Sequence, residues 1–279
     1  MEENGGLNAF GKVSSLRVVA GRADRGTYLK ELSFTAPFKV MSPFVLPDGS
    51  IRVMPLFASS GIMEGDIQKI HMETEPYTKM ECISQSWEKL HRMKTGYAKR
   101  NTLLKVARES VMVYRPLPVI PFDQSAFEGY TEICLEDATS SMFYQEILSC
   151  GRVKKGERFG YRYYNSLSEV RRCKRLIYRE NNRFRPALDG MEETGMFEGY
   201  SYLATILIFH TNSLSYMEEI RELLDNTSGM CGGATFTADS DMVVRILSNQ
   251  MQKLQQICDK IYDIFMPFPR SDSILIEEE

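Results

Sequence analysis

Three side chains that could hold a metal ion recur at alternate positions in the segment His71-Met-Glu73-Thr-Glu75. Alternate residues of a β-strand point to the same side of a sheet, so His71, Glu73 and Glu75 would share one face. An imidazole beside carboxylates suits a divalent transition metal. Lys69 lies on the same predicted face, and a solvated strand face explains the pattern as well. The spacing therefore indicates a candidate metal site on the surface.

Three other acids interrupt apolar stretches of the chain. Asp66 ends the turn SSGIMEGD, Glu146 lies within SMFYQEIL, and Glu180 ends KRLIYRE. Burying an isolated carboxylate is costly, so each of these acids needs a cation, hydrogen bonds or water. The local sequence leaves two interpretations open: pairing with an arginine from the basic segment 152–185, or a functional role.

The segment SQSWEKLHRM, residues 84–93, holds the single tryptophan and one of three histidines. Imidazole suits Ni²⁺, but no second histidine lies at a local ligand spacing from His91. We therefore expect Trp87 to be a packing anchor and His91 to be a hydrogen-bonded residue at a strand end. The segment as a whole is interpreted as scaffold near a functional surface.

Common catalytic signatures are missing from the sequence. It contains no GxSxG, HExxH or GxxxxGK[ST] motif and no GxGxxG after a predicted strand. The six cysteines lie far apart without a CxxC pair, which favours buried thiols over a disulfide framework or a zinc site. The residues themselves therefore give little support for an enzyme. A β-rich hydrolase with an unrecognised site is the lowest-ranked alternative.

Composition and charge limit the class of protein further. The 279 residues are 43% hydrophobic and 25% charged, which is ordinary for a globular protein. The acidic start MEENGG is unlike a signal peptide, and the longest apolar run, YLATILIF, is too short to cross a bilayer. We expect a cytoplasmic protein without a membrane partner.

Charge is distributed unevenly along the chain. Residues 152–185 carry 12 Lys and Arg against 3 Asp and Glu, whereas residues 186–279 carry 5 against 16. This asymmetry predicts a polarised surface for protein partners. No nucleic-acid-binding signature accompanies the basic segment, so we expect no nucleic-acid partner.

Most of the chain has the pattern of short strands. The runs are rich in β-branched and aromatic residues and are separated by Gly, Pro, Asn or Asp. They are TYLKELSF, IRVMPLFAS, IQKIHMET, TKMECISQS, SVMVYRP, TEICLED, SMFYQEIL, RFGYRYYN and KRLIYRE. The prolines of YRPLPVIPF require an extended path at 114–122.

The C-terminal third differs by containing two predicted helices. A capping box at Ser215-Tyr-Met-Glu218 opens a helix that ends near Gly229, followed by a Gly-rich strand, GGATFTAD. Apolar residues then recur at helical spacing from Met251 to Phe265. We predict a single β-rich domain over residues 1–265 and a flexible tail over 266–279.

Five segments together resemble the UreD/UreH family of urease accessory proteins, most of all its Helicobacter-type members. In order they are PFKVMSPF (37–44), SSGIMEGD (59–66), SQSWEKLHRM (84–93), PLPVIPF (116–122) and EILSCGRVKKGERF (146–159). Each is common by itself, but five in the family's order form a specific signal. The resemblance is close over roughly the first 160 residues. Within segment 84–93, Trp87 and Glu88 depart from the run that is common elsewhere in the family.

The resemblance implies both a fold and a function. The fold would be a helically wound arrangement of stacked β-sheets with two α-helices packed against it. The protein would be a non-enzymatic accessory protein that, with a helical UreF-type partner and a UreG-type GTPase, delivers nickel to apo-urease. It would bind no cofactor tightly, and nickel would pass transiently. Because the family is thought to pass nickel through an acid-lined internal tunnel, Asp66, Glu146 and Glu180 become candidates for a nickel path.

The same resemblance directs attention to the C-terminal third as a partner surface. An apolar strip on a helix needs a neighbour, and any part that the sheets leave uncovered is available for docking. The predicted partner-binding residues are Met217, Ile220, Leu223, Leu224, Ile274, Leu275 and Ile276. The alternative function is a β-rich interaction scaffold without a direct metal-conducting role.

Overall fold

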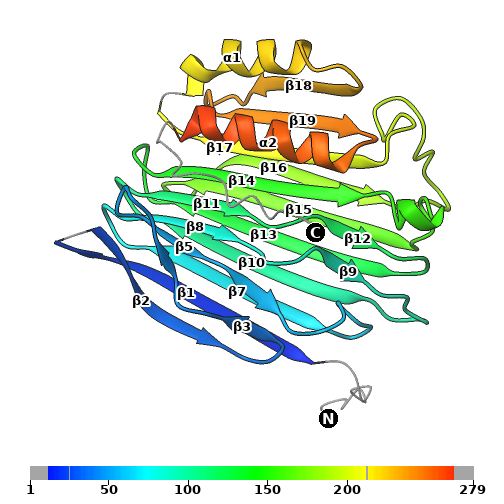
Figure 1. Ribbon diagram of the computed structural model, residues 1–279, viewed down its shortest axis with the longest axis horizontal. Coiled ribbons are helices and arrows are strands. Elements are labelled where there is room, and N and C mark those ends of the chain that lie inside the picture. The colour runs from blue at the N-terminus through cyan, green and yellow to red at the C-terminus, as the bar shows by residue number, and fades with distance from the viewer. Residues whose placement is uncertain (1–11, 25, 212, 267–279) are drawn as a thin grey trace, which may run out of the picture.

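The structure is a computed structural model that describes residues 12–24, 26–211 and 213–266. Over these residues the chain forms two stacked β-sheets, with two helices beside the C-terminal strands (Figure 1). The prediction of a mainly β fold with stacked sheets and two late helices is confirmed. The predicted tail lies outside the described residues except for Met266, and the predicted domain division stays a prediction.

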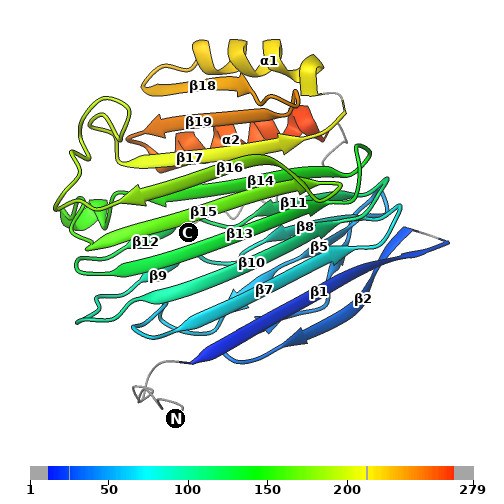
Figure 2. The same cartoon turned by 180° about the vertical axis from the view of Figure 1, so that it is seen from behind.

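The first sheet has seven strands in the order β16-β15-β13-β10-β7-β1-β2. Its members are β1 (Val13–Ala23), β2 (Gly26–Phe34), β7 (Ile67–Thr74), β10 (Ala98–Val106), β13 (Ala126–Leu135), β15 (Tyr163–Arg172) and β16 (Arg175–Phe184). Strands β1, β7, β10, β13 and β15 pair in parallel, and β2 and β16 close the two edges as antiparallel hairpins. Figure 2 shows this sheet from its outer side.

The second sheet has ten strands, with the main path β18-β19-β17-β14-β11-β8-β5-β4. Its members are β4 (Phe44–Val45), β5 (Ile51–Val53), β8 (Lys79–Ile83), β9 (Glu88–Leu90), β11 (Val111–Arg115), β12 (Val119–Pro121), β14 (Ser141–Ser149), β17 (Tyr202–Phe209), β18 (Met230–Phe236) and β19 (Met242–Ser248). The short strands β9 and β12 join beside β14. A separate two-stranded pair is formed by β3 (Phe38–Val40) and β6 (Pro55–Phe57).

The chain winds back and forth between the two sheets. It passes from β7 to β8, from β10 to β11 and from β13 to β14, so each coil adds one parallel strand to both sheets. Parallel neighbours need a crossover connection, and here the opposite sheet provides it in place of a helix. The winding agrees with the predicted helical arrangement of strands.

Residues that point inward from both sheets form the central core. The seven-stranded sheet contributes Leu16, Met72 and Leu104, and the ten-stranded sheet contributes Met112 and Met142. These side chains are at most 1% exposed. A separate apolar cluster includes Leu90 of β9 and Val119 of β12, and members of both clusters line the cavities of the candidate site.

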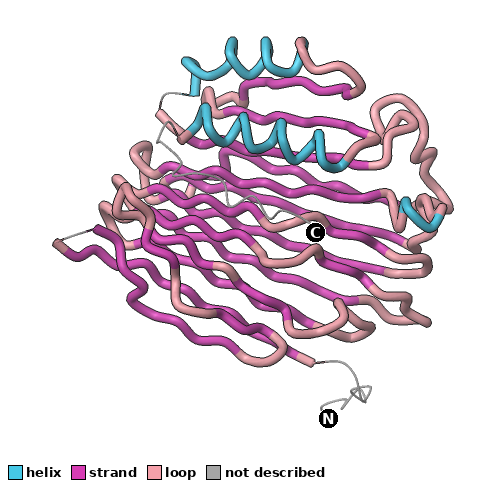
Figure 3. Tube along the Cα trace, viewed as in Figure 1, coloured by secondary structure: helices cyan, strands magenta, loops and turns pink. Residues whose placement is uncertain are grey.

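The two helices lie together beside the last strands (Figure 3). Helix α2 (Met251–Phe265) packs on β17 and β19 through its apolar face, and Leu254 and Ile261 there are fully buried. Its bounds match the predicted helical spacing. Helix α1 (Ser213–Asp225) lies against β18 and α2, beginning two residues before the predicted capping box and ending before Gly229. No helix in the described part of the chain is long and apolar enough to span a membrane.

The uneven charge of the sequence is partly balanced within the fold. Arg172 of the basic segment lies 2.6 Å from the Asp241 carboxylate, and Arg175 pairs with Asp239. In the same way Arg158 pairs with Glu192. The basic and acidic segments thus neutralise part of each other's charge. The surface that the sequence predicts for protein partners is therefore less polarised than expected.

Candidate functional site

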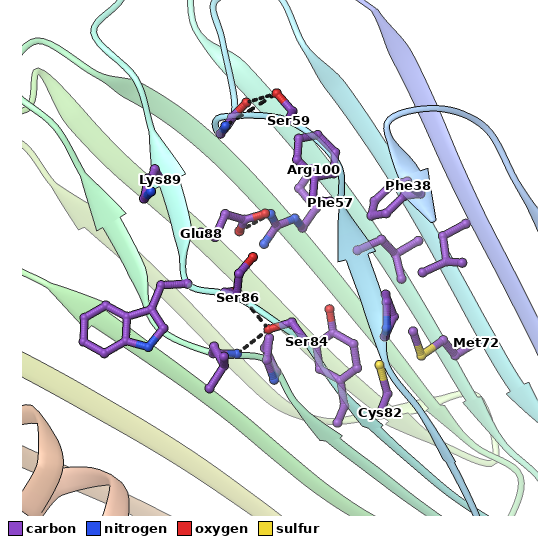
Figure 4. Close-up of a pocket in the computed structure, with 18 of the residues that line it drawn as sticks. Phe38, Phe57, Ser59, Met72, Cys82, Ser84, Ser86, Glu88, Lys89 and Arg100 are labelled. Carbon is purple, nitrogen blue, oxygen red and sulfur yellow. Dashed lines mark hydrogen bonds and ion pairs between the residues drawn. The ribbon is translucent and has the colours of Figure 1, made fainter. Parts of the chain in front are cut away.

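The segment 84–93 lies at the mouth of a cavity of about 160 Å³ between the two sheets. Ser84, Ser86 and Glu88 line this outer cavity, together with the inward side chains Met72 and Cys82 (Figure 4). The Ser84 hydroxyl accepts a hydrogen bond from the backbone N–H of Leu117 at 2.7 Å, which fixes the loop that follows β8. The loop after β8 therefore contributes two short polar side chains, Ser84 and Ser86, to the cavity wall.

The predictions for two further residues of this segment, His91 and Trp87, have different outcomes. His91 follows strand β9, and its Nε2 lies 2.9 Å from the carbonyl oxygen of Ser60, so the predicted hydrogen-bonded histidine at a strand end is confirmed. Trp87 is 36% exposed and lines the cavity, so its predicted role as an interior packing anchor is wrong. Trp87 lies in the loop between β8 and β9, so no strand directs the indole into the core.

A partly buried ion pair lies at the inner end of the outer cavity. Glu88 on β9 pairs with Arg100 on β10, and Arg100 Nε donates to Gln68 Oε1 at 2.8 Å. The guanidinium also lies 5.4 Å from the centre of the Phe127 ring. Burial lowers the pKa of Arg100, but the carboxylate of Glu88 outweighs this and the net pKa is raised. Arg100 therefore carries a permanent positive charge between the sheets.

A second, inner cavity of about 30 Å³ lies next to the first. Glu146 on β14 projects into it, where Tyr164 Oη donates to Glu146 Oε1 at 2.5 Å and Ser166 Oγ lies 3.3 Å from Oε2. Burial is the main cause of a raised pKa of Glu146, and the hydrogen bond from Tyr164 opposes it. The carboxyl group is thus held by neutral hydroxyl donors inside the fold.

Glu180 on β16 lies close to this group. Its carboxylate accepts hydrogen bonds from Tyr178 Oη at 3.0 Å and from Arg245 Nη2 at 2.5 Å. The charge of Glu180 contributes to the raised pKa of Glu146, so the structure brings these two predicted residues together. Glu146 is bonded by hydroxyl groups, and Glu180 pairs with Arg245 of β19. Neither acid therefore pairs with an arginine of segment 152–185.

Asp66 lies apart from these two acids. Its Oδ2 accepts a hydrogen bond from the backbone N–H of Met63 at 2.8 Å, and its Oδ1 accepts one from the backbone N–H of Lys12 at 3.4 Å. It lines neither of the two cavities. The carboxylate closes the turn that leads into β7.

The set His71, Glu73 and Glu75 lies on the outer side of the seven-stranded sheet. Arg17 Nη1 lies 2.5 Å from His71 Nδ1, and His71 Nε2 lies 3.3 Å from Glu73. Lys30 pairs with Glu75. Burial, followed by the charge of Arg17, lowers the pKa of His71. Among the described residues, no three His, Cys, Asp or Glu side chains are grouped so that they could hold a metal ion.

The predicted partner-binding residues divide into three groups. Met217 and Ile220 are buried in the cluster beneath the helices, whereas Leu223 and Leu224 are only partly buried at its margin. Residues 274–276 lie outside the described part of the chain. Of the four predicted residues on α1, only Leu223 and Leu224 near its C-terminal end are therefore partly exposed.

The roles of two residues of the site, Glu88 and Arg100, are not predicted from the sequence. Arg100 lies in AKRNTLLKV, where the polar residues resemble a solvated strand, and Glu88 comes from a different sheet. Their pairing depends on the stacking of β9 over β10. The burial of Arg100 between apolar residues becomes visible only once the two sheets are placed.

Comparison with known proteins finds matches over most of the chain. The family model described as "UreD urease accessory protein" matches residues 12–271. A protein named urease accessory protein UreD from Acetivibrio thermocellus is 36% identical over 259 residues, which cover 92% of this chain and 98% of that protein. A protein named urease accessory protein UreH from Helicobacter pylori strain G27 is 30% identical over 257 residues, which cover 91% and 96%.

Proposed function

Because the chain belongs to the UreD family of urease accessory proteins, we propose that it delivers nickel to apo-urease. In this proposal it acts in the cytoplasm as a non-catalytic member of a complex with a helical UreF-type protein and a UreG-type GTPase. Nickel is its cargo rather than a resident cofactor. The family membership supports a role in urease maturation, and the interior of the sandwich supports the role in metal transfer.

The observation that carries the proposal is the pair of buried carboxylates, Glu146 and Glu180. Apolar walls alone would repel an ion, whereas carboxylate oxygens replace part of its hydration shell. Carboxylates also hold Ni²⁺ less strongly than imidazole or thiolate groups. Each hand-over must stay reversible until urease captures the metal, so oxygen ligands suit transfer better than storage.

Glu146 is the better placed of the two acids for this role. Its partners Tyr164 and Ser166 are hydroxyl donors, so no directly bonded cation neutralises it. Glu180 is held by Arg245 and would stabilise an ion on Glu146 mainly through its charge. Asp66 is the third acid of the proposed path, and its place at the turn before β7 puts it at the periphery.

Two further assignments complete the proposal. We place the partner contact at the C-terminal end of α1, with Leu223 and Leu224, and at the tail residues 274–276. The group His71, Glu73 and Glu75 is a separate surface candidate for the metal, which would have to displace Arg17 and Lys30.

Reconstitution tests this function against the alternative of an interaction scaffold. Apo-urease, the UreF-type and UreG-type partners and this chain are purified, and ⁶³Ni²⁺ is supplied bound to the GTPase. Delivery is supported if nickel transfer to urease depends on this chain in a way that complex formation alone does not explain. Equal transfer in a complex whose chain carries Glu146→Gln together with Glu180→Gln would favour the scaffold.

A further inference from the structure

Arg100 lies at the junction of the two inter-sheet cavities. Four residues line both cavities: Arg100, Tyr114, Pro116 and Leu117. Arg100 is the charged member of this set. Its partner Glu88 lies on the outer side, while Glu146 lies on the inner side. An ion that moves from the outer cavity directly into the inner one passes this guanidinium.

We infer that Arg100 is a charge gate that controls the access of cations to the inner cavity. The guanidinium is charged at every physiological pH, and repulsion between like charges is strong where little water screens it. Gln68 and the ring of Phe127 hold it in place beside Glu88. In the arrangement described here, the gate therefore opposes a small cation and not a small neutral molecule.

Glu88 connects the gate to the mouth of the cavity. The same carboxylate that pairs with Arg100 faces the outer cavity, so a cation that binds Glu88 competes with the guanidinium. Capture of an ion at the mouth would thereby free Arg100 to leave the junction. The inference rests on the proposed function only for the identity of the cation as nickel.

A cysteine reporter tests the gate without urease or partner proteins. Ser166→Cys places a thiol in the inner cavity, and Cys82 is a natural thiol in the outer one. Cys258, on the buried face of α2 and outside both cavities, reports on unfolding. The full chain is exposed to Ag⁺ or to neutral methyl methanethiosulfonate. Thiols that remain free are alkylated after denaturation and quantified site by site by mass spectrometry.

Two substitutions separate charge from packing. In the reporter chain, Arg100→Met removes the charge at similar volume, whereas Arg100→Lys keeps it. We expect Arg100→Met to speed the reaction of Ag⁺ at position 166 by about tenfold or more. Arg100→Lys should leave that rate within about threefold, and the neutral reagent should change by less than about threefold in both variants.

Several outcomes would overturn the inference. Equal acceleration of Ag⁺ and the neutral reagent, or equal acceleration by Met and Lys, would show that Arg100 acts through packing alone. Fast Ag⁺ labelling of position 166 with Arg100 intact and Cys258 protected would show that no gate exists. A confirmed gate together with normal urease loading in the Glu146 and Glu180 variants would leave the gate standing and remove the proposed nickel path.

Discussion

Tyr164 on β15 donates its hydroxyl hydrogen to Glu146 on β14 across the space between the two sheets, with 2.5 Å between the oxygens. The pair joins two strands of opposite sheets at the inner cavity. Burial makes the phenol an obligate donor, because it raises the pKa of Tyr164 well above its usual range. A carboxyl group is thus kept inside the fold without a bonded cation.

The buried state of Glu146 predicts how stability depends on pH. Its pKa is raised in the folded chain, chiefly by burial, so the folded state binds the proton more tightly than the unfolded state. The stabilisation that this group contributes is fully present below its pKa in the unfolded state, about pH 4. It is lost as the pH rises through its pKa in the folded state. Glu146→Gln should therefore match wild type in Tm at about pH 4 and exceed it near neutral pH.

Thermal unfolding between acid and neutral pH checks this dependence. Glu132→Gln, on the outer side of the sheet where Glu132 is paired with Arg171 at 3.5 Å, is the control for an exposed carboxylate. A Glu146→Gln advantage that is largest in acid would contradict the assigned direction of the pKa shift.

Arg115 predicts a second, independent stability effect. It is 8% exposed on the outer side of the ten-stranded sheet, pairs with Asp259 of α2, and lies 4.3 Å from the centre of the Tyr262 ring. Arg115 Nη1 also lies 3.9 Å from the buried Glu81 carboxylate. Arg115→Met should lower the free energy of unfolding by about 3 kcal/mol, because Glu81 then keeps only its 2.6 Å contact with Arg52. Asp259→Asn, at a half-exposed side chain, should lower the free energy of unfolding by less than about 1 kcal/mol. Urea unfolding that gives equal losses would show that the pair with Asp259, rather than the buried charge, dominates.

The partner surface gives a third prediction. Leu223→Asp and truncation after Met266 should each weaken co-elution with the UreF-type partner in gel filtration, because each removes apolar surface from the proposed contact. Glu222→Gln, an exposed change on the same helix, is the matched control. Normal complexes from both altered chains, with an unchanged Tm, would place the contact elsewhere.

The sequence predicts much of the fold where alternation is clean. The segment IQKIHMET coincides with β7, and the α2 face follows from regular apolar spacing. The prediction fails at RFGYRYYN, because β15 begins only at Tyr163 and runs to Arg172. Charged residues on the outer face made the second half of that strand resemble a loop. AKRNTLLKV and MVVRILS were missed as strands as well.

The candidate site was predictable only in part. The apolar context of Glu146 correctly indicated a buried carboxylate, because an acid within an aromatic and aliphatic strand has few alternatives. Its closeness to Glu180 depends on the hairpin of β15 and β16 and on sheet stacking, which no local pattern encodes. The pair of Glu88 and Arg100 was missed for the same reason.

The central claim is that Glu146 and Glu180 conduct nickel to urease, and loading under limiting nickel tests it most directly. Wild type is compared with Glu146→Gln/Glu180→Gln, with and without Asp66→Asn, in the assembled complex. Glu128→Gln/Glu132→Gln, on the outer side of β13, controls for loss of charge. The proposal predicts normal assembly of all variants and a several-fold lower nickel content and activation rate of urease only when the inner acids are changed. Activation at the wild-type rate by an assembled inner-acid variant would contradict it and make these acids structural.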